Sequence, residues 1–210
     1  MGLEVWYVAA GNCGFKKTMM RKLVEFIARI IMSFAYAAQK EEGLNLMFQF
    51  IPSRLIAPTL RKHGALIGKN VDIHTPIQFH NVSTVKGRHY ENLKIGDNSY
   101  LGRDVFIDLA DQVTLEANVT VSMKVILITH THVGKSALGV EKLKPSYAPI
   151  VLRESCYVGA NATILQGVEL GRNVIVGAGA VVISSVEEND VVVGVPAKTT
   201  YHRISKNDHD

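Results

Sequence analysis

Aliphatic or phenylalanine side chains recur at every sixth position of the chain between residues 67 and 182, in five blocks of three. All fifteen positions in this phase carry Ile, Leu, Val or Phe: Ile67, Ile73, Phe79, Ile95, Leu101, Ile107, Leu115, Val121, Leu127, Leu152, Val158, Ile164, Leu170, Val176 and Val182. A period of six does not fit an α-helix, in which neighbours on one face are three and four residues apart. It fits one short strand followed by one corner, and such a short fixed period is typical of a parallel β-helix.

The residues between these inward-facing positions fit the same geometry. Glycine often follows the phase residue, as at Gly68, Gly96, Gly102, Gly159, Gly171 and Gly177. Glycine permits the backbone angles of a tight corner, and Asn or Asp at other corner positions tolerates left-handed angles. Three six-residue units make one triangular coil, so the five blocks predict an all-β fold, a parallel β-helix of about five coils with aliphatic side chains stacked inside. The spacing of the repeats does not determine the hand of the β-helix. The general rule for parallel crossovers favours a right-handed turn.

A different pattern precedes the repeats. Apolar residues recur at helical spacing from Leu23 to Ala38, with Lys22, Glu25 and Arg29 opposite them, which predicts an amphipathic helix. Two roles stay open for this helix: a cap or subunit contact for the β-helix, or a weak peripheral contact with a membrane surface. Neither a secretory signal nor a transmembrane span is expected, because charges interrupt the apolar run well before about eighteen residues.

The chain divides into an N-terminal helical and connecting segment at 1–63, a β-helix domain at 64–198 and a C-terminal tail at 199–210. Its 210 residues, 47% of them hydrophobic, suffice for one sizeable domain with an appendage. The net charge of +4 is not gathered into a long basic run, so nucleic acid is not an expected partner. Two cysteines are too few for a disulfide scaffold, which favours a reducing compartment, and Cys156 is expected to pack in the core.

The six-residue rhythm is interrupted twice. The first break, 85–93, is short and polar, and the second is the long segment ITHTHVGKSALGVEKLKPSYAPIV that follows Leu127. Regular coils of a solenoid supply packing, whereas function concentrates in the loops that leave them. We expect residues 133–150 to form a loop extruded from the β-helix, with an active site at the histidines that precede it.

With these features the sequence resembles the hexapeptide-repeat acyltransferases, and most closely the O-acetyltransferases that act on sugars, such as the maltose and capsular-polysaccharide enzymes. The resemblance covers about residues 64–203 and rests on the repeats, the THTH segment with its loop, the stretch VGANATILQGVELGRNVIVGAGAVV and the closing VVVGVPAK. It implies a left-handed β-helix, a homotrimer with its active site between subunits, acetyl-CoA as co-substrate and a sugar or glycan acceptor. The low cysteine count agrees with a cytoplasmic enzyme, and a membrane contact of the N-terminal helix would place it at the inner face of the membrane.

Acetyl transfer to a hydroxyl needs a base for the hydroxyl proton and a donor for the oxyanion. Histidine suits the first role because its pKa lies near neutrality, and the candidates are His130 and His132. His132 occupies the sixth position of its hexapeptide, the corner that carries the base in the enzymes the chain resembles. It is therefore favoured, with His130 left open. No serine or cysteine is obviously paired with these histidines, so no covalent intermediate is expected.

The resemblance also implies which residues hold coenzyme A. Main-chain groups near Ala160 and Ala178 would line the pantetheine arm, and Lys198 and Arg203 would meet the phosphates. Many relatives carry Thr-Lys after the final GAGAVV, where this chain has Ile-Ser at 183–184. Any phosphate contact made by that lysine is missing here, so coenzyme A must depend on the other groups.

The acceptor pocket is the least constrained part of the site. Asp104 and Asp108 lie on the coil before the THTH coil and can hydrogen-bond a sugar hydroxyl, although corner aspartates more often cap turns. Tyr147, within the loop, can line the pocket. His74 and His80 fall on the first coil, and we expect them to be surface residues distant from the loop.

Two other functions compete with acetyl transfer. The γ-class carbonic anhydrases share this solenoid, but their zinc needs three histidines, two of them five residues apart on one strand. This chain offers pairs two and six apart, so no metal is expected. A non-catalytic structural solenoid explains the repeats, but it explains neither the histidine-bearing break nor the VGVPAK ending.

Overall fold

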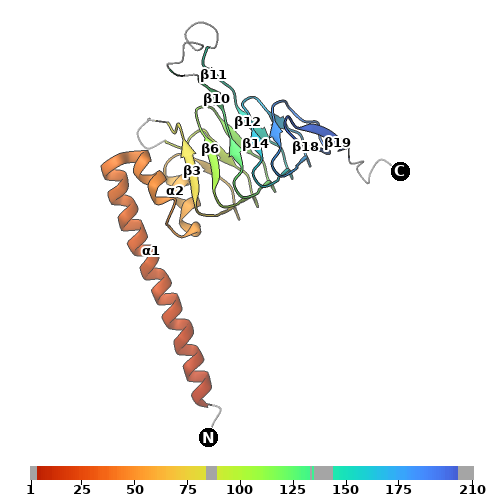
Figure 1. Ribbon diagram of the computed structural model, residues 1–210. Coiled ribbons are helices and arrows are strands. Elements are labelled where there is room, and N and C mark those ends of the chain that lie inside the picture. The colour runs from red at the N-terminus through yellow and green to blue at the C-terminus, as the bar shows by residue number, and fades with distance from the viewer. Residues whose placement is uncertain (1–3, 84–88, 133, 135–143, 203–210) are drawn as a thin grey trace. The chain divides into compact units, whose positions relative to one another are not determined.

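The computed structural model describes residues 4–83, 89–132, 134 and 144–202, with side chains described from Thr18 onward (Figure 1). The chain forms two compact units, residues 1–47 and 48–210. Residues 48–63, which the sequence pattern groups with the N-terminal segment, therefore belong to the same compact unit as the β-helix.

The first unit contains one helical element, α1 (Glu4–Met47), which includes the predicted amphipathic helix. Its direction changes at Lys40, whose φ of 52° and ψ of −127° are not helical. A Cβ atom on Gly43 would lie 2.1 Å from the carbonyl oxygen of Ala35, so the kinked chain has room only for glycine there. Within the described part of the chain, no helical stretch combines the length and the apolar character that crossing a bilayer requires.

The second unit is a triangular prism of short parallel strands, with one sheet on each face (Figure 1). Face 1 consists of β1 (Leu66–Ile67), β4 (Leu93–Ile95), β7 (Val113–Leu115), β12 (Ile150–Leu152) and β15 (Glu169–Leu170). Face 2 consists of β2 (Asp72–Ile73), β5 (Tyr100–Leu101), β8 (Thr120–Val121), β13 (Tyr157–Val158), β16 (Ile175–Val176) and β18 (Asp190–Val193), to which β19 (Lys198–His202) pairs antiparallel. Face 3 consists of β3 (Ile77–His80), β6 (Val105–Asp108), β9 (Ile126–Leu127), β14 (Thr163–Ile164) and β17 (Val181–Val182). Strands taken in chain order visit the three faces in turn, which confirms the predicted β-helix of about five coils.

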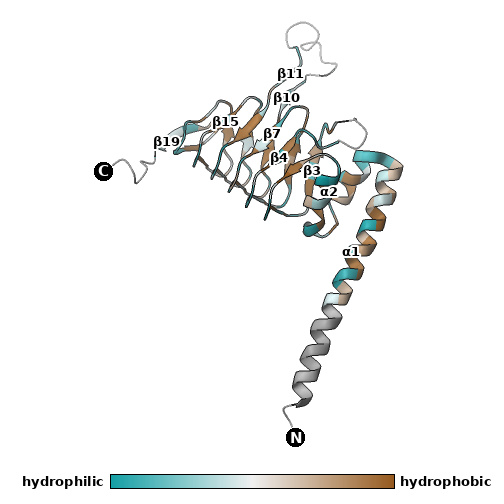
Figure 2. Cartoon of the chain, turned by 180° about the vertical axis from the view of Figure 1, so that it is seen from behind, coloured by the Kyte–Doolittle hydropathy of each residue, from teal (hydrophilic) through white to brown (hydrophobic). Residues whose placement is uncertain are grey.

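The six-residue rhythm forms the core of this prism. Parallel pairing sets the phase residues of neighbouring coils opposite one another, as for Phe79, Ile107 and Leu127 on face 3. Every phase residue is buried except Ile67 on the first coil, which is half-buried. Figure 2 shows the hydrophobic colour concentrated along the strands of the prism. Burial of this ladder supplies the main hydrophobic stabilisation of the fold.

Asparagine holds many of the corners. Seven asparagines have φ between 51° and 64°, the left-handed region that asparagine tolerates better than most side chains: Asn70, Asn81, Asn98, Asn118, Asn161, Asn173 and Asn189. Their amides can also bond from coil to coil, as between Asn70 Nδ2 and Asn98 Oδ1 at 3.2 Å. The same side chain therefore turns the chain and links successive coils.

The segment that follows α1 closes the first coil. It contains η1 (Ser53–Leu55) and α2 (Ile56–Lys62), which contact the first strands of faces 1 and 2. The ring of Phe48 lies 5.7 Å from Phe79 and 6.0 Å from Tyr90 between centroids, and all three rings are buried. The open end of the prism is thus covered from within the second unit, and a capping role for α1 stays a prediction.

Cys156 is a core residue, as expected from its place in the repeat. Its side chain is buried, and its thiol donates to the carbonyl oxygen of Gly171 at 2.9 Å. Burial raises the pKa of this thiol to about 11. In a Cys13→Ser background at pH 8, we expect a disulfide reagent to modify the native protein at least about a hundredfold more slowly than the protein in guanidinium chloride. Equal rates in the two states would contradict a buried Cys156.

The second break of the rhythm is a hairpin that leaves the prism after β9. Its strands are β10 (His130–Thr131) and β11 (Ser146–Tyr147), which pair antiparallel so that His130 lies opposite Tyr147. The chain then returns to face 1, where β12 stacks directly on β7. Figure 1 shows β10 and β11 projecting from the prism. Of the loop predicted at 133–150, residues 133 and 135–143 lie outside the described residues, as do residues 85–88 of the first break.

Candidate active site

Asp108 and His130 meet where the hairpin leaves the prism. Asp108 ends β6 on face 3, His130 begins β10, and the Oδ2 atom of Asp108 lies 2.6 Å from the Nδ1 atom of His130. The side chain of Asp108 is 1% exposed and that of His130 is 24% exposed. The pair therefore joins a buried carboxylate to an imidazole that solvent and ligands can reach.

Besides His130, Thr129 and Asn81 hold the Asp108 carboxylate. Thr129 donates to Oδ2 from its backbone N–H at 2.9 Å and from its hydroxyl at 2.7 Å, and the Asn81 amide donates to Oδ1 at 2.8 Å. Burial raises the pKa of Asp108, but hydrogen bonds from His130, Thr129 and Asn81 outweigh it and hold the pKa of this carboxyl below its ordinary value. Asp108 is therefore an anion at neutral pH. Because its oxygens are engaged by the protein, it orients His130 rather than offering a free acceptor to a substrate hydroxyl.

The hydrogen bonds of the two candidate histidines favour opposite tautomers. Because the Asp108 carboxylate can only accept, the Nδ1 atom of His130 must donate, which leaves a lone pair on Nε2 for proton abstraction. The Nδ1 atom of His132 instead accepts from the backbone N–H of Gly134 at 3.1 Å, so neutral His132 carries its proton on Nε2. His132 is exposed. In this geometry His130 has the chemistry of a general base, whereas resemblance alone favoured His132.

Two further aromatic rings flank His130. The ring of Tyr147 is stacked on it, with centroids 6.1 Å apart and an interplanar angle of 17°, and its role as a lining residue of the acceptor pocket stays a prediction. The ring of His80 lies 6.3 Å from that of His130. The expectation that His80 is distant from the hairpin is therefore wrong, because β3 and β6 pair in register and set His80 opposite Asp108. His74 directly follows β2, the first strand of face 2, and its Nε2 atom lies 3.0 Å from the Oδ2 atom of Asp72.

A groove of mixed polar and apolar lining lies beside His130, at the edge of the prism where the face 3 strands end. It is a cavity of about 200 Å³ lined by Ile128, His130, Thr131, Leu165, Gln166 and Ile183. Ile128, Leu165 and Ile183 each directly follow the face 3 strand of successive coils, so the apolar lining steps from coil to coil.

Gln166 fixes the hairpin to the next coil. Its side-chain amide donates to the Thr131 hydroxyl at 3.1 Å and to the Ser146 hydroxyl at 2.9 Å, one on each strand of the hairpin. The strands that carry His130 and Tyr147 are thereby held beside the groove. Sequence reasoning did not single out Gln166, Thr129 or Asn81; the only signal in the sequence was that Thr129 belongs to the THTH segment.

The other predicted residues are more scattered. Ala160 and Ala178 occupy the corner between faces 2 and 3 on neighbouring coils, where the Ala160 carbonyl oxygen accepts from the Gly179 N–H at 2.8 Å. This corner precedes the face 3 strands, whereas the groove follows them. Lys198 is exposed at the start of β19, and Arg203 lies outside the described residues. Asp104 has a φ of 58° at the corner before β6, at the opposite end of that strand from Asp108, which is the position of a turn residue.

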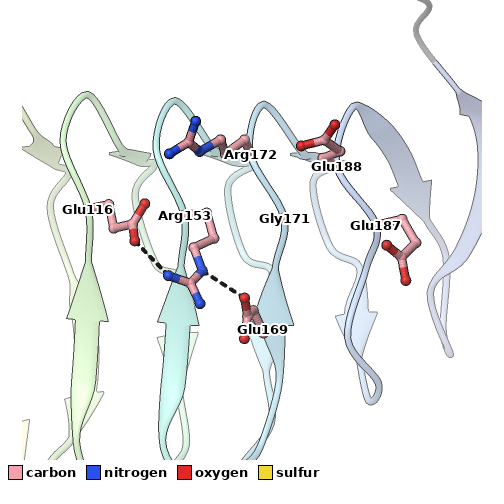
Figure 3. Close-up of a pocket in the computed structure, with 7 residues that line it drawn as sticks. All are labelled: Glu116, Arg153, Glu169, Gly171, Arg172, Glu187 and Glu188. Carbon is pink, nitrogen blue, oxygen red and sulfur yellow. Dashed lines mark hydrogen bonds and ion pairs between the residues drawn. The ribbon is translucent and has the colours of Figure 1, made fainter.

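A second hollow, of about 350 Å³, is lined by charged residues on four successive coils and by Gly171 (Figure 3). Arg153 lies at its centre, 2.8 Å from Glu116 and 2.7 Å from Glu169, on the coils before and after its own. Hydrogen bonds from Arg153 lower the pKa of Glu116. Because Arg153 forms ion pairs with both Glu116 and Glu169, the three side chains make an ion-pair network between coils. Among the residues the structure describes, no group of three or more His, Cys, Asp or Glu side chains could hold a metal ion.

Comparison with known proteins agrees with this architecture. The family model of the bacterial transferase hexapeptide, with six repeats, matches residues 149–184. A protein of Escherichia coli K12 named as a colanic acid biosynthesis acetyltransferase, WcaF, is 31% identical over 145 residues, which are 69% of this chain and 73% of that protein.

Two solved structures share the fold. A hexapeptide-repeat acetyltransferase from Vibrio cholerae, solved with acetyl-CoA, matches with a TM-score of 0.67 and 19% identity over 84% of this chain and 89% of that one. A maltose O-acetyltransferase from Clostridium difficile matches with a TM-score of 0.66 and 18% identity over 85% of this chain and 89% of that one. The fold is accordingly the left-handed β-helix that the resemblance implied. The chain belongs to the bacterial hexapeptide-repeat transferase family, and its relatives there make it an acetyltransferase.

Proposed function

We propose that the protein transfers an acetyl group from acetyl-CoA to a hydroxyl of a sugar or glycan precursor. The observation that carries the proposal is the pair of Asp108 and His130 beside a groove in the surface of the prism. The WcaF relative is named for colanic acid biosynthesis, and a neighbour in fold acts on maltose, which supports a carbohydrate acceptor. Because acetyl-CoA is an intracellular metabolite, the proposal places the enzyme in the cytoplasm.

The chemistry requires one proton to be moved twice. The Nε2 atom of His130 takes the proton of the acceptor hydroxyl as its oxygen attacks the thioester carbonyl. Collapse of the tetrahedral oxyanion breaks the carbon–sulfur bond, and the imidazolium returns the proton to the departing thiolate. The anionic Asp108 stabilises the imidazolium between these steps and keeps the ring in the required tautomer. Asp104 and Tyr147 are the remaining acceptor contacts proposed from the sequence, and Tyr147 is the one that adjoins His130.

We infer that the complete site lies between subunits of a homotrimer. The groove beside His130 has about 200 Å³ in a single chain, whereas small-molecule sites in proteins usually enclose about 300–1,000 Å³. A neighbouring subunit would supply the missing wall. Light scattering coupled to size exclusion tests the assembly, and a monomer with full activity would contradict it.

The pantetheine arm of coenzyme A is proposed to follow the groove past Leu165 and Ile183, while Ala160, Ala178, Lys198 and Arg203 stay proposed contacts from the resemblance. Lys198→Glu should raise the KM for acetyl-CoA about tenfold with little change in kcat, because an ion pair with a phosphate is replaced by repulsion. Lys69→Glu, the same charge change at an exposed position on the first coil, is the control. An unchanged KM in the Lys198 variant would count against this contact.

The function itself is tested by an acceptor screen. Purified protein is incubated with acetyl-CoA and a panel of sugars, glycan precursors and amines, while free thiol is measured as it is released. Release that depends on a sugar, with an acetyl ester found in the product by mass spectrometry, is the expected result. Release only with amines would establish N-acetylation instead, and zinc-dependent hydration of carbon dioxide would revive the carbonic anhydrase alternative.

A further inference from the structure

The described part of α1 carries a broad apolar face that is open to solvent. Nine large side chains on it are 41–73% exposed: Met19, Met20, Leu23, Val24, Phe26, Ile27, Ile30, Ile31 and Phe34. With 3.6 residues per turn, these nine fall within an arc of about 160°. Exposed contiguous apolar surface of this kind marks a binding site for another surface.

Cations border this face on both sides. From the helical angles, Lys22 and Arg29 lie beside one edge of the arc and Arg21 lies beyond the other. Residues 18–39 contain these three cations and one carboxylate, Glu25, which is 3.3 Å from Arg21. Lysine and arginine can extend their charges outward while their alkyl stems lie along apolar neighbours. The surface therefore combines apolar area with a positive border.

We propose that α1 lies in the plane of a bilayer surface rich in anionic lipid, with the nine-residue face at the acyl boundary and the cations among the headgroups. The charges of Lys22, Glu25 and Arg29 along the helix fit an orientation in the plane of the bilayer. A second copy of α1 fits this face less well. The arc is wider than the two-position seam of a coiled coil, and parallel copies would bring the cationic borders of both helices together. The proposal does not depend on the acceptor of the acetyl group.

The test uses the full chain and sedimentation with two kinds of vesicle, phosphatidylcholine alone and an equimolar mixture with phosphatidylserine. The wild type should sediment with the mixed vesicles and only weakly with phosphatidylcholine. Lys22→Gln with Arg29→Gln should weaken binding to the mixed vesicles about 20- to 30-fold, since each cation near an anionic surface contributes about a factor of five. Leu23→Gln with Phe34→Gln should abolish it, whereas Thr18→Gln, on the side of the helix opposite the apolar arc, is the matched control.

Acetyl transfer measured in solution shows that each variant is folded, because none of these substitutions lies in the proposed active site. Absence of wild-type binding to the mixed vesicles overturns the proposal. Equal binding to both kinds of vesicle overturns the electrostatic part of it. If light scattering shows that Leu23→Gln with Phe34→Gln dissociates the wild-type oligomer and vesicle binding is absent, a second copy covers this face and the lipid proposal is wrong.

Discussion

Replacing His130 with alanine is expected to lower kcat for acetyl transfer about 10²- to 10⁴-fold, the range that a positioned general base contributes. The KM for acetyl-CoA should change by less than about threefold, because the proposed arm contacts at Leu165 and Ile183 remain. Initial rates of thiol release at saturating acetyl-CoA measure the first effect. Added imidazole should restore part of the rate, since the substitution leaves space where the ring was.

His132→Ala is the matched control for this experiment. It removes the same side chain two residues further on, where the ring is exposed and its described hydrogen bond is the one from the Gly134 N–H. We expect it to retain most of the wild-type kcat. If His132→Ala instead carries the larger loss, the base is the corner histidine that resemblance favoured, and the hairpin must adopt another geometry during reaction.

The fold could be predicted from the sequence because one short rule generates it. A residue that points inward every six positions fixes strand, corner and stacking register together, and the pairing of Phe79 with Ile107 and of Ile107 with Leu127 follows from that count. The N-terminal region obeys no such rule. Its helix is evident from the apolar spacing, but the kink at Lys40 depends on a local close approach that spacing does not encode.

The geometry of the candidate site follows only in part from the same repeat register. The repeat register pairs Phe79 with Ile107 and therefore sets the next residues, His80 and Asp108, opposite each other. The position of these two residues near the β10–β11 hairpin could thus have been derived from the sequence. The bond between Asp108 and His130 could not, because it depends on how β10 turns after leaving face 3. The choice of tautomer depends in turn on that bond. Sequence spacing therefore located the histidines without deciding which one is the base.

Substituting Asp108 with asparagine is expected to lower kcat about a hundredfold or more, although the new side chain has nearly the same shape. An amide can donate to the Nδ1 atom of His130, which shifts the ring proton to Nε2 and removes the lone pair that accepts the hydroxyl proton. The buried donors of Thr129 and Asn81 also lose an anionic acceptor. We therefore expect the free energy of unfolding to fall by about 1–3 kcal/mol.

Two measurements separate the tautomer effect from the loss of stability. Nitrogen NMR of the His130 ring should find the neutral ring protonated on Nδ1 in the wild type and on Nε2 in Asp108→Asn; protonation on Nδ1 in both would contradict the orienting role. The stability difference must also depend on pH. Because folding lowers the pKa of Asp108, its contribution is complete above the unfolded value near 3.9 and is lost as pH falls through the lower folded value. The unfolding free energies of wild type and variant should therefore stay apart down to about pH 4 and converge as the pH falls further. A gap that persists unchanged well below about pH 4 would mean that the carboxylate charge plays no part.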